Sequence, residues 1–193
     1  MYTPDSRGVL NLLLTTNLDI VETDSPSRFV IRAVDGKVQM EIHVEMTEDE
    51  TDRSVIGIDL EVRNLATVEL TEPHAAEIYH DLLEFNGSRA VGGVQVDSKT
   101  GVVGYAHSDA LIPLGEDGES DLELLEALIA CFTKNAARAK SRIEQARDTG
   151  KTHHARRREE LDREIEEVFA RAWEQYEQSM TEESAEEDSE RKK

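Results

Sequence analysis

The alternation of apolar and polar residues on either side of Asp35-Gly36 is the feature that most restricts the fold of this chain. Apolar residues occupy every second position in residues 29–34 before the dipeptide and in residues 38–44 after it. Such alternation places successive side chains on opposite faces of a strand, and Asp-Gly is a common two-residue hairpin turn. The pattern therefore predicts an antiparallel hairpin. A third strand is predicted at 56–62, after the acidic loop 47–53.

Apolar residues at helical spacing occur in two segments that follow the third strand. Thr71 is a suitable N-cap and Pro73 is tolerated in a first turn, so a helix is predicted over 72–85. Ser120 and Glu123 form a capping box, which predicts the start of a second, longer helix. The apolar face of that longer helix comprises Leu122, Leu125, Ile129, Phe132, Ala136, Ala139 and Ile143.

The remaining segments of residues 1–150 complete the expected domain. The apolar run at 9–14 fits a helix or a strand, and we favour a short helix. Residues 90–96 and 102–106 predict a second hairpin. The expected fold class is α+β, with an antiparallel sheet of about five strands packed by helices in the order α-β-β-β-α-β-β-α.

The composition changes after Gly150, where a basic cluster precedes a strongly amphipathic segment. An additional helix is predicted over 151–180, and two interpretations of its apolar stripe stay open. The helix docks on its own domain, or it presents the stripe to a partner or to a dimer mate. Residues 181–193 have almost no apolar content and predict a disordered acidic tail. The residues of the stripe are Leu161, Ile165, Val168, Phe169, Trp173 and Tyr176.

The charge of the chain restricts its partners. It has 42 Asp and Glu residues against 22 Lys and Arg, a formal net charge of −20. Nucleic acid and anionic membranes are therefore unexpected partners, because both recruit proteins through basic surfaces. Two explanations of the excess of acidic residues stay open: it increases the solubility of a protein that binds aggregation-prone partners, or it reflects adaptation of a whole proteome to high salt.

A cytoplasmic location is expected. The single cysteine excludes an intramolecular disulfide and suits a reducing compartment. Residues 1–7 lack the basic region that opens a signal peptide, and no apolar stretch approaches about 18 residues, the length of a membrane span.

Residues 82–112, LLEFNGSRAVGGVQVDSKTGVVGYAHSDALI, join the end of a helix to a two-strand hairpin, and the long helix follows. In this segment, and in the order of elements over roughly residues 8–147, the chain resembles the YbjN family and its structural relatives, the class I type III secretion chaperones. The resemblance implies a twisted antiparallel sheet with helices on one side, a homodimer, and a role in binding or regulating client proteins. The short N-terminal helix and the added C-terminal helix depart from that pattern.

Residues with reactive side chains are better explained by structural roles. Cys131 lies in an apolar helical segment and is predicted to be buried and inert. Adjacent residues on a helix point about 100° apart, so His153 and His154 do not form a chelating pair. We predict no catalytic, cofactor or metal site. The acidic residues of the loop lack the order of a calcium-binding loop, and they are Glu48, Asp49, Glu50 and Asp52.

The leading hypothesis is a non-enzymatic, chaperone-like or regulatory module that binds a segment of a client protein. The sheet and the helix 72–85 would present surfaces for the client and for self-association. One alternative is an enzyme of unknown type that combines Asp or Glu with His74, His80 or His107. Another is a structural coiled-coil adaptor in which residues 153–180 assemble oligomers.

Overall fold

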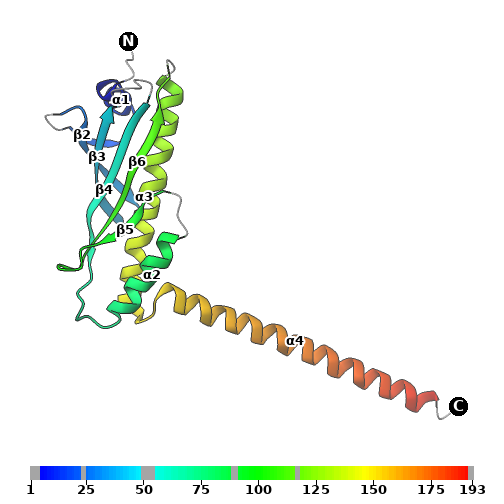
Figure 1. Cartoon of the computed structure of the whole chain (residues 1–193). Helices are drawn as coiled ribbons and strands as arrows, with labels where there is room; N and C mark the ends of the chain where they lie inside the picture. The colour runs from blue at the N-terminus through cyan, green and yellow to red at the C-terminus, as the bar shows by residue number, and fades with distance from the viewer. Residues whose placement is uncertain (1–4, 23–24, 49–54, 88–90, 116–117, 191–193) are drawn as a thin grey trace. The chain divides into compact units, whose positions relative to one another are not determined.

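The computed structural model divides the chain into two units, Met1–Thr152 and His153–Lys193 (Figure 1). It describes residues 5–22, 25–48, 55–87, 91–115 and 118–190. The second unit contains one helix, α4 (His153–Glu190). The first unit contains α1 (Ser6–Leu13), β1 (Asp19–Glu22), β2 (Arg28–Asp35), β3 (Val38–Glu48), β4 (Val55–Thr67), α2 (Ala75–Gly87), β5 (Gly93–Val96), β6 (Val102–Pro113) and α3 (Gly118–Thr149).

The α+β class is confirmed, and the described residues form a sheet of six antiparallel strands in the order β1-β2-β3-β4-β6-β5. The additional strand relative to the prediction is β1, which pairs with β2. The predicted hairpin is confirmed as β2 and β3, with Asp35 opposite Val38 and Gly36 at a φ of 60°. Glycine adopts this left-handed conformation without the steric cost of a Cβ atom, as the tight turn requires.

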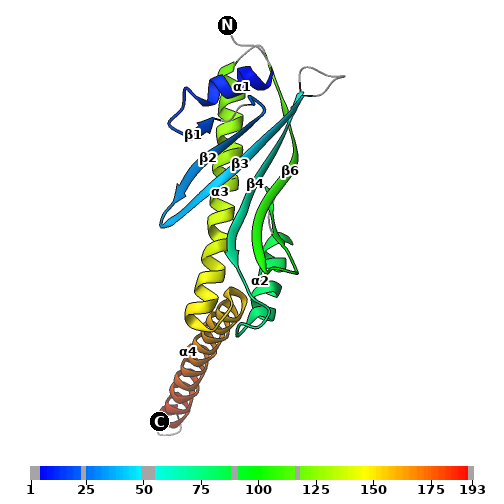
Figure 2. The same ribbon diagram turned by 90° about the vertical axis from the view of Figure 1, so that its left-hand side faces the viewer.

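The long helix α3 covers one face of the sheet, and Figure 2 views the sheet from its other, open face. The buried side chains of β2, β3 and β4 are apolar and alternate with side chains on the open side, as the sequence pattern predicted. The predicted face of α3 is buried, with Phe132, Ala136, Ala139 and Ile143 fully covered. Tyr105 of β6 lies in this core, edge-on to the ring of Phe132 at a centroid distance of 5.2 Å.

Both predicted helix starts differ from the structure. Helix α2 begins at Ala75 instead of residue 72, so Thr71 is not its N-cap. The preceding residue, His74, has a φ of 65°, which lies outside the right-handed helical region. Helix α3 begins at Gly118, two residues before Ser120, so the predicted capping box lies inside the helix.

The second hairpin also differs from its prediction. Strand β6 runs to Pro113 instead of ending at residue 106, because β4 continues to pair with it. A register shift lies between Ile58 and Leu60, where the carboxylate of Asp59 accepts a hydrogen bond from the backbone N–H of Asp109 at 2.7 Å. Such an irregularity lets a strand continue through residues that interrupt the alternation. Strand β5 begins at Gly93, and residues 88–90 lie outside the described residues.

Helix α4 continues to Glu190, whereas residues 181–193 were predicted to be disordered. Neither Gly nor Pro occurs after Gly150, and Glu and Ala are strong helix formers, so low apolar content does not by itself end a helix. Residues 191–193 lie outside the described residues. Among the helices that the structure describes, none combines the length and the apolar character needed to cross a lipid bilayer.

Candidate functional site

An apolar hollow of about 290 Å³ lies between α2 and the edge strand β5, and we call it the α2–β5 groove. Helix α2 buries Ile78, Leu82 and Phe85 in the core, and this leaves Leu83 on its outer side. The side chains of Leu83 and Leu70 are 69% and 71% exposed. The groove is lined by Leu70, Tyr79, Leu82, Leu83, Asn86, Val94, Val96 and Ser98.

Two polar side chains of the groove, Tyr79 and Asn86, form hydrogen bonds with the backbone. The Tyr79 hydroxyl donates to the carbonyl of Val68. Desolvation raises the pKa of Tyr79, and the negative charge of Glu72 adds to the effect. Tyr79 therefore stays neutral at physiological pH and offers its ring to an apolar ligand.

The side-chain amide of Asn86 occupies the backbone hydrogen-bonding groups in the middle of the outer edge of β5. Its Oδ1 accepts from the N–H of Val94 at 2.6 Å, and its Nδ2 donates to the carbonyl of Val94 at 3.0 Å. The N–H of Asp97 donates to the carbonyl of Val102, so in the antiparallel pairing of β5 with β6 the backbone groups of Val94 and Val96 point away from β6. Because Asn86 occupies the groups of Val94, side-chain contacts in the groove are favoured over addition of a strand at this edge.

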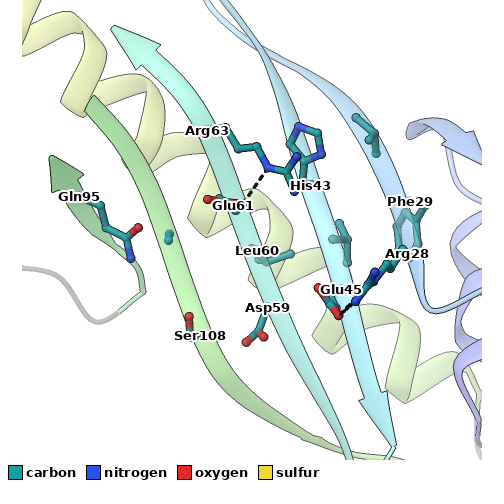
Figure 3. A pocket seen from close by; sticks show the side chains of 13 residues that line it. Arg28, Phe29, His43, Glu45, Asp59, Leu60, Glu61, Arg63, Gln95 and Ser108 are labelled. Atoms are coloured by element: carbon teal, nitrogen blue, oxygen red, sulfur yellow. Dashed lines mark hydrogen bonds and ion pairs between the residues drawn. The ribbon is translucent and has the colours of Figure 1, made fainter. Parts of the chain in front are cut away.

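A second, polar hollow of about 450 Å³ lies on the open face of the sheet (Figure 3). Four of its charged residues pair within the face, Arg28 with Glu45 at 2.5 Å and Arg63 with Glu61 at 3.0 Å, and a fifth, Asp59, accepts the hydrogen bond from the N–H of Asp109. His43 lies directly across from Glu61 on the neighbouring strand. Exposed ion pairs of this kind contribute little to stability and leave no strong local field to hold a charged ligand.

The three histidines of the enzyme hypothesis lie on different elements. His74 precedes α2, and His80 lies on α2 with its Nδ1 3.8 Å from a carboxylate oxygen of Glu84. His107 lies on β6, where its Nδ1 accepts from the N–H of Gly92 at 3.1 Å. Within the described part of the chain, Glu84 is the one carboxylate within 4 Å of any of these three histidines, and it is a neighbour on the same exposed helix surface.

Cys131 is exposed, so its prediction as a buried residue is wrong. It precedes the buried Phe132 by one position, which turns it by about 100° from the covered face of α3. Among the described residues, no group of three or more His, Cys, Asp or Glu is placed to hold a metal ion. Of the acidic loop, Glu48 accepts from the N–H of Ser6 at 2.9 Å, and residues 49–54 lie outside the description.

The predicted stripe of α4 is exposed along the part that the structure describes. The exposed fractions are 47% for Leu161, 44% for Ile165, 57% for Val168, 71% for Phe169 and 63% for Trp173. The side chains of Tyr176 and His154 lie outside the description, while the backbone of both is helical.

The groove combines residues from four separate segments, and the sequence indicated only part of it. Tyr79 and Leu83 extend the apolar face of α2 beyond what one buried stripe needs, and this excess was the available signal. Leu70, Val96 and Asn86 carried no comparable signal. No family model matches the chain, and a search of curated proteins finds no match.

Proposed function

We propose that the chain is a non-enzymatic, chaperone-like or regulatory module that holds an apolar segment of a client protein in the α2–β5 groove. The observation that carries the proposal is the exposure of Leu70, Leu83 and Val96 around one hollow, at 71%, 69% and 41%. Solvent-exposed apolar side chains that cluster in this way characterise interaction sites. The role agrees with the one that the resemblance to the YbjN family implies.

The form of the groove favours a peptide over an enclosed small molecule. Its volume of about 290 Å³ lies just below the roughly 300–1,000 Å³ typical of small-molecule pockets. A shallow apolar site of this size suits one or two anchoring side chains of a longer segment. Since Asn86 covers the middle of the β5 edge, the segment is held through its side chains, as an amphipathic helix is held in a groove.

The client segment is expected to combine apolar anchors with basic flanking residues. The groove lining is uncharged, but the chain carries a net charge of −20. Such a field repels acidic segments and accelerates association with basic ones. We place this interaction in the cytoplasm, since the chain has one cysteine and forms no internal disulfide.

Selection from a library of displayed random peptides on the full-length protein tests the proposal. Peptides with apolar anchors and flanking Lys or Arg should be enriched, and their affinities can be measured by fluorescence polarisation. Leu83→Glu should weaken binding by about tenfold or more, because it places a charge in the apolar site. The matched control is Leu124→Glu, at an exposed position of α3 that does not line the groove.

Retention of peptide affinity by Leu83→Glu would place the binding surface elsewhere and overturn the proposal. Equal losses in Leu83→Glu and Leu124→Glu would overturn it as well, because they would show a general effect of the added negative charge. Thermal unfolding of both variants checks whether each retains the folded domain.

A further inference from the structure

The two ends of α4 carry opposite charges. Residues 153–158 contain three arginines, two histidines and no carboxylate. Residues 181–190 contain six Asp or Glu and no Lys or Arg. Both segments belong to one continuous helix, α4. The helix is therefore a rod with a positive beginning and a negative end.

An exposed apolar stripe lies between these charged ends. Leu161, Ile165, Val168 and Ala172 follow one another at spacings of four, three and four residues, which places them along one side of the helix. This is the spacing by which two helices pack side by side in a coiled coil. Within its own unit α4 is the one element that the structure describes, so burial of the stripe requires another surface.

We propose that α4 pairs in antiparallel orientation with α4 of a second copy of this chain. A parallel pair would place arginines beside arginines and carboxylates beside carboxylates. An antiparallel pair places the basic beginning of each helix along the acidic end of the other, and it does so twice because the pair has two-fold symmetry. Charge complementarity thus selects both the partner and the orientation.

One antiparallel register places apolar residues of the two helices opposite one another and also pairs their opposite charges. It places Leu161 opposite Met180 and Val168 opposite Trp173, and it sets the large Phe169 against the small Ala172. Alternation of large and small residues across an interface allows close packing.

The same register brings charged positions into complementary pairs. Position 158, an arginine, lies opposite position 183, a glutamate, and position 154, a histidine, lies opposite position 187, a glutamate. Positions 154 and 158 continue the four-and-three spacing of the stripe, so these charge pairs lie at the two ends of the interface, where a mismatch of charge would oppose the wrong orientation. The inference is independent of the α2–β5 groove, which belongs to the other unit.

Charge reversal with reciprocal rescue tests the pairing on the full-length protein. Sedimentation equilibrium of the wild type should give a dimer of about twice the 21.7 kDa chain at micromolar concentration. Arg157→Glu/Arg158→Glu and Glu183→Arg/Glu186→Arg should each weaken self-association by roughly tenfold or more, since like charges then meet at both ends. An equimolar mixture of the two variants should recover near wild-type association, because opposite charges meet again at both ends.

Arg163→Glu/Arg171→Glu is the matched control. It changes the net charge by the same amount as Arg157→Glu/Arg158→Glu, but on the side of α4 away from the stripe. The dissociation constant of the dimer should therefore stay within about threefold of the wild-type value. Circular dichroism checks whether each variant keeps its helix content. A monomeric wild type at tens of micromolar, or equal weakening by the control, would overturn the proposal.

Orientation is tested separately by disulfide cross-linking in a Cys131→Ser background. Arg158→Cys and Glu183→Cys should form a cross-linked heterodimer when the two variants are mixed and oxidised, and neither variant should cross-link efficiently alone. Efficient cross-linking of each variant with itself would show a parallel pair and refute the antiparallel arrangement. Neither experiment involves the peptides that bind the groove, so failure of one proposal is distinguishable from failure of the other.

Discussion

Arg147 holds the carboxylate of Glu72 through two hydrogen bonds, from Nε to Oε2 and from Nη2 to Oε1, each 2.9 Å long. The same guanidinium donates to the backbone carbonyl of Thr67. Arg147 lies in the last turn of α3, Thr67 ends β4, and Glu72 precedes α2. The pair therefore ties the approach to α2, one wall of the groove, to the end of the long helix.

Glu72→Gln should destabilise the domain by about 1 kcal/mol, the upper range for a partly exposed ion pair. The substitution preserves the shape of the side chain but removes its charge and one of the two acceptor oxygens. Urea unfolding at pH 7 measures the difference. Glu126→Gln, at an exposed position of α3, is the control and should leave the free energy of unfolding within about 0.5 kcal/mol.

The effect of Glu72→Gln should depend on pH. The hydrogen bonds from Arg147 lower the pKa of Glu72 in the folded chain below its ordinary value of 4.5. The stabilisation is then complete above pH 4.5 and is lost as the pH falls through the lowered folded pKa. The difference in melting temperature between wild type and Glu72→Gln should be constant from pH 6 to 8 and should shrink below about pH 4.5. A difference that persists unchanged at pH 3 would contradict this account.

Asp81→Ala should cost about 3 kcal/mol or more in the free energy of unfolding. Asp81 of α2 lies 3.2 Å from Nη1 of Arg142 of α3, and the side chains are only 5% and 19% exposed. Removal of the carboxylate leaves a buried guanidinium without its counter-charge, and this is costly. Asp81→Leu/Arg142→Leu should cost much less than the sum of the single changes. Additive costs in a double-mutant cycle would show that the two residues act independently.

Local patterns in the sequence predicted most of the sheet, and long-range pairing produced the rest. The β2–β3 hairpin follows from the alternation around Asp35-Gly36. Strand β1 has only four residues, Asp19–Glu22, and it is a strand because β2 offers it an edge. The second half of β6 contains Ser108 and Asp109, which interrupt the alternation, and the register shift with β4 accommodates them.

The candidate sites were predictable to different degrees for a related reason. The stripe of α4 lies within one helix, so helical spacing alone identified it. The groove assembles side chains from α2, β5 and the segments beside them, which are adjacent only after the sheet has formed. The start of α2 was predicted too early because Thr71 and Pro73 fit a helix start, whereas His74 adopts a left-handed conformation before it.

Trp173→Ala should separate the stability of the two units. At sub-micromolar concentration, where the proposed pair dissociates, the unfolding free energy of residues 1–152 should stay within about 0.5 kcal/mol of wild type, as for ordinary exposed positions. Self-association at higher concentration should weaken. Trp173 is the only tryptophan, so its fluorescence in the wild type should shift to the blue as the concentration rises. Protection from quenchers in the dilute monomer would mean that Trp173 is already buried by its own chain.

Asn86→Ala should both destabilise the domain and expose the β5 edge. Two hydrogen bonds from the Asn86 amide, at 2.6 and 3.0 Å, satisfy the outward N–H and carbonyl of Val94. Their loss should cost about 2 kcal/mol, measured by urea unfolding, at roughly 1 kcal/mol for each bond. The opened edge then offers unpaired backbone groups beside exposed apolar side chains, the arrangement that promotes edge-to-edge association. Light scattering of Asn86→Ala should therefore rise with concentration and time, whereas Asn64→Ala, at an exposed position of β4, should behave as wild type. An Asn86→Ala protein that is less stable yet stays monodisperse would show that the amide braces α2 against β5 without guarding the edge.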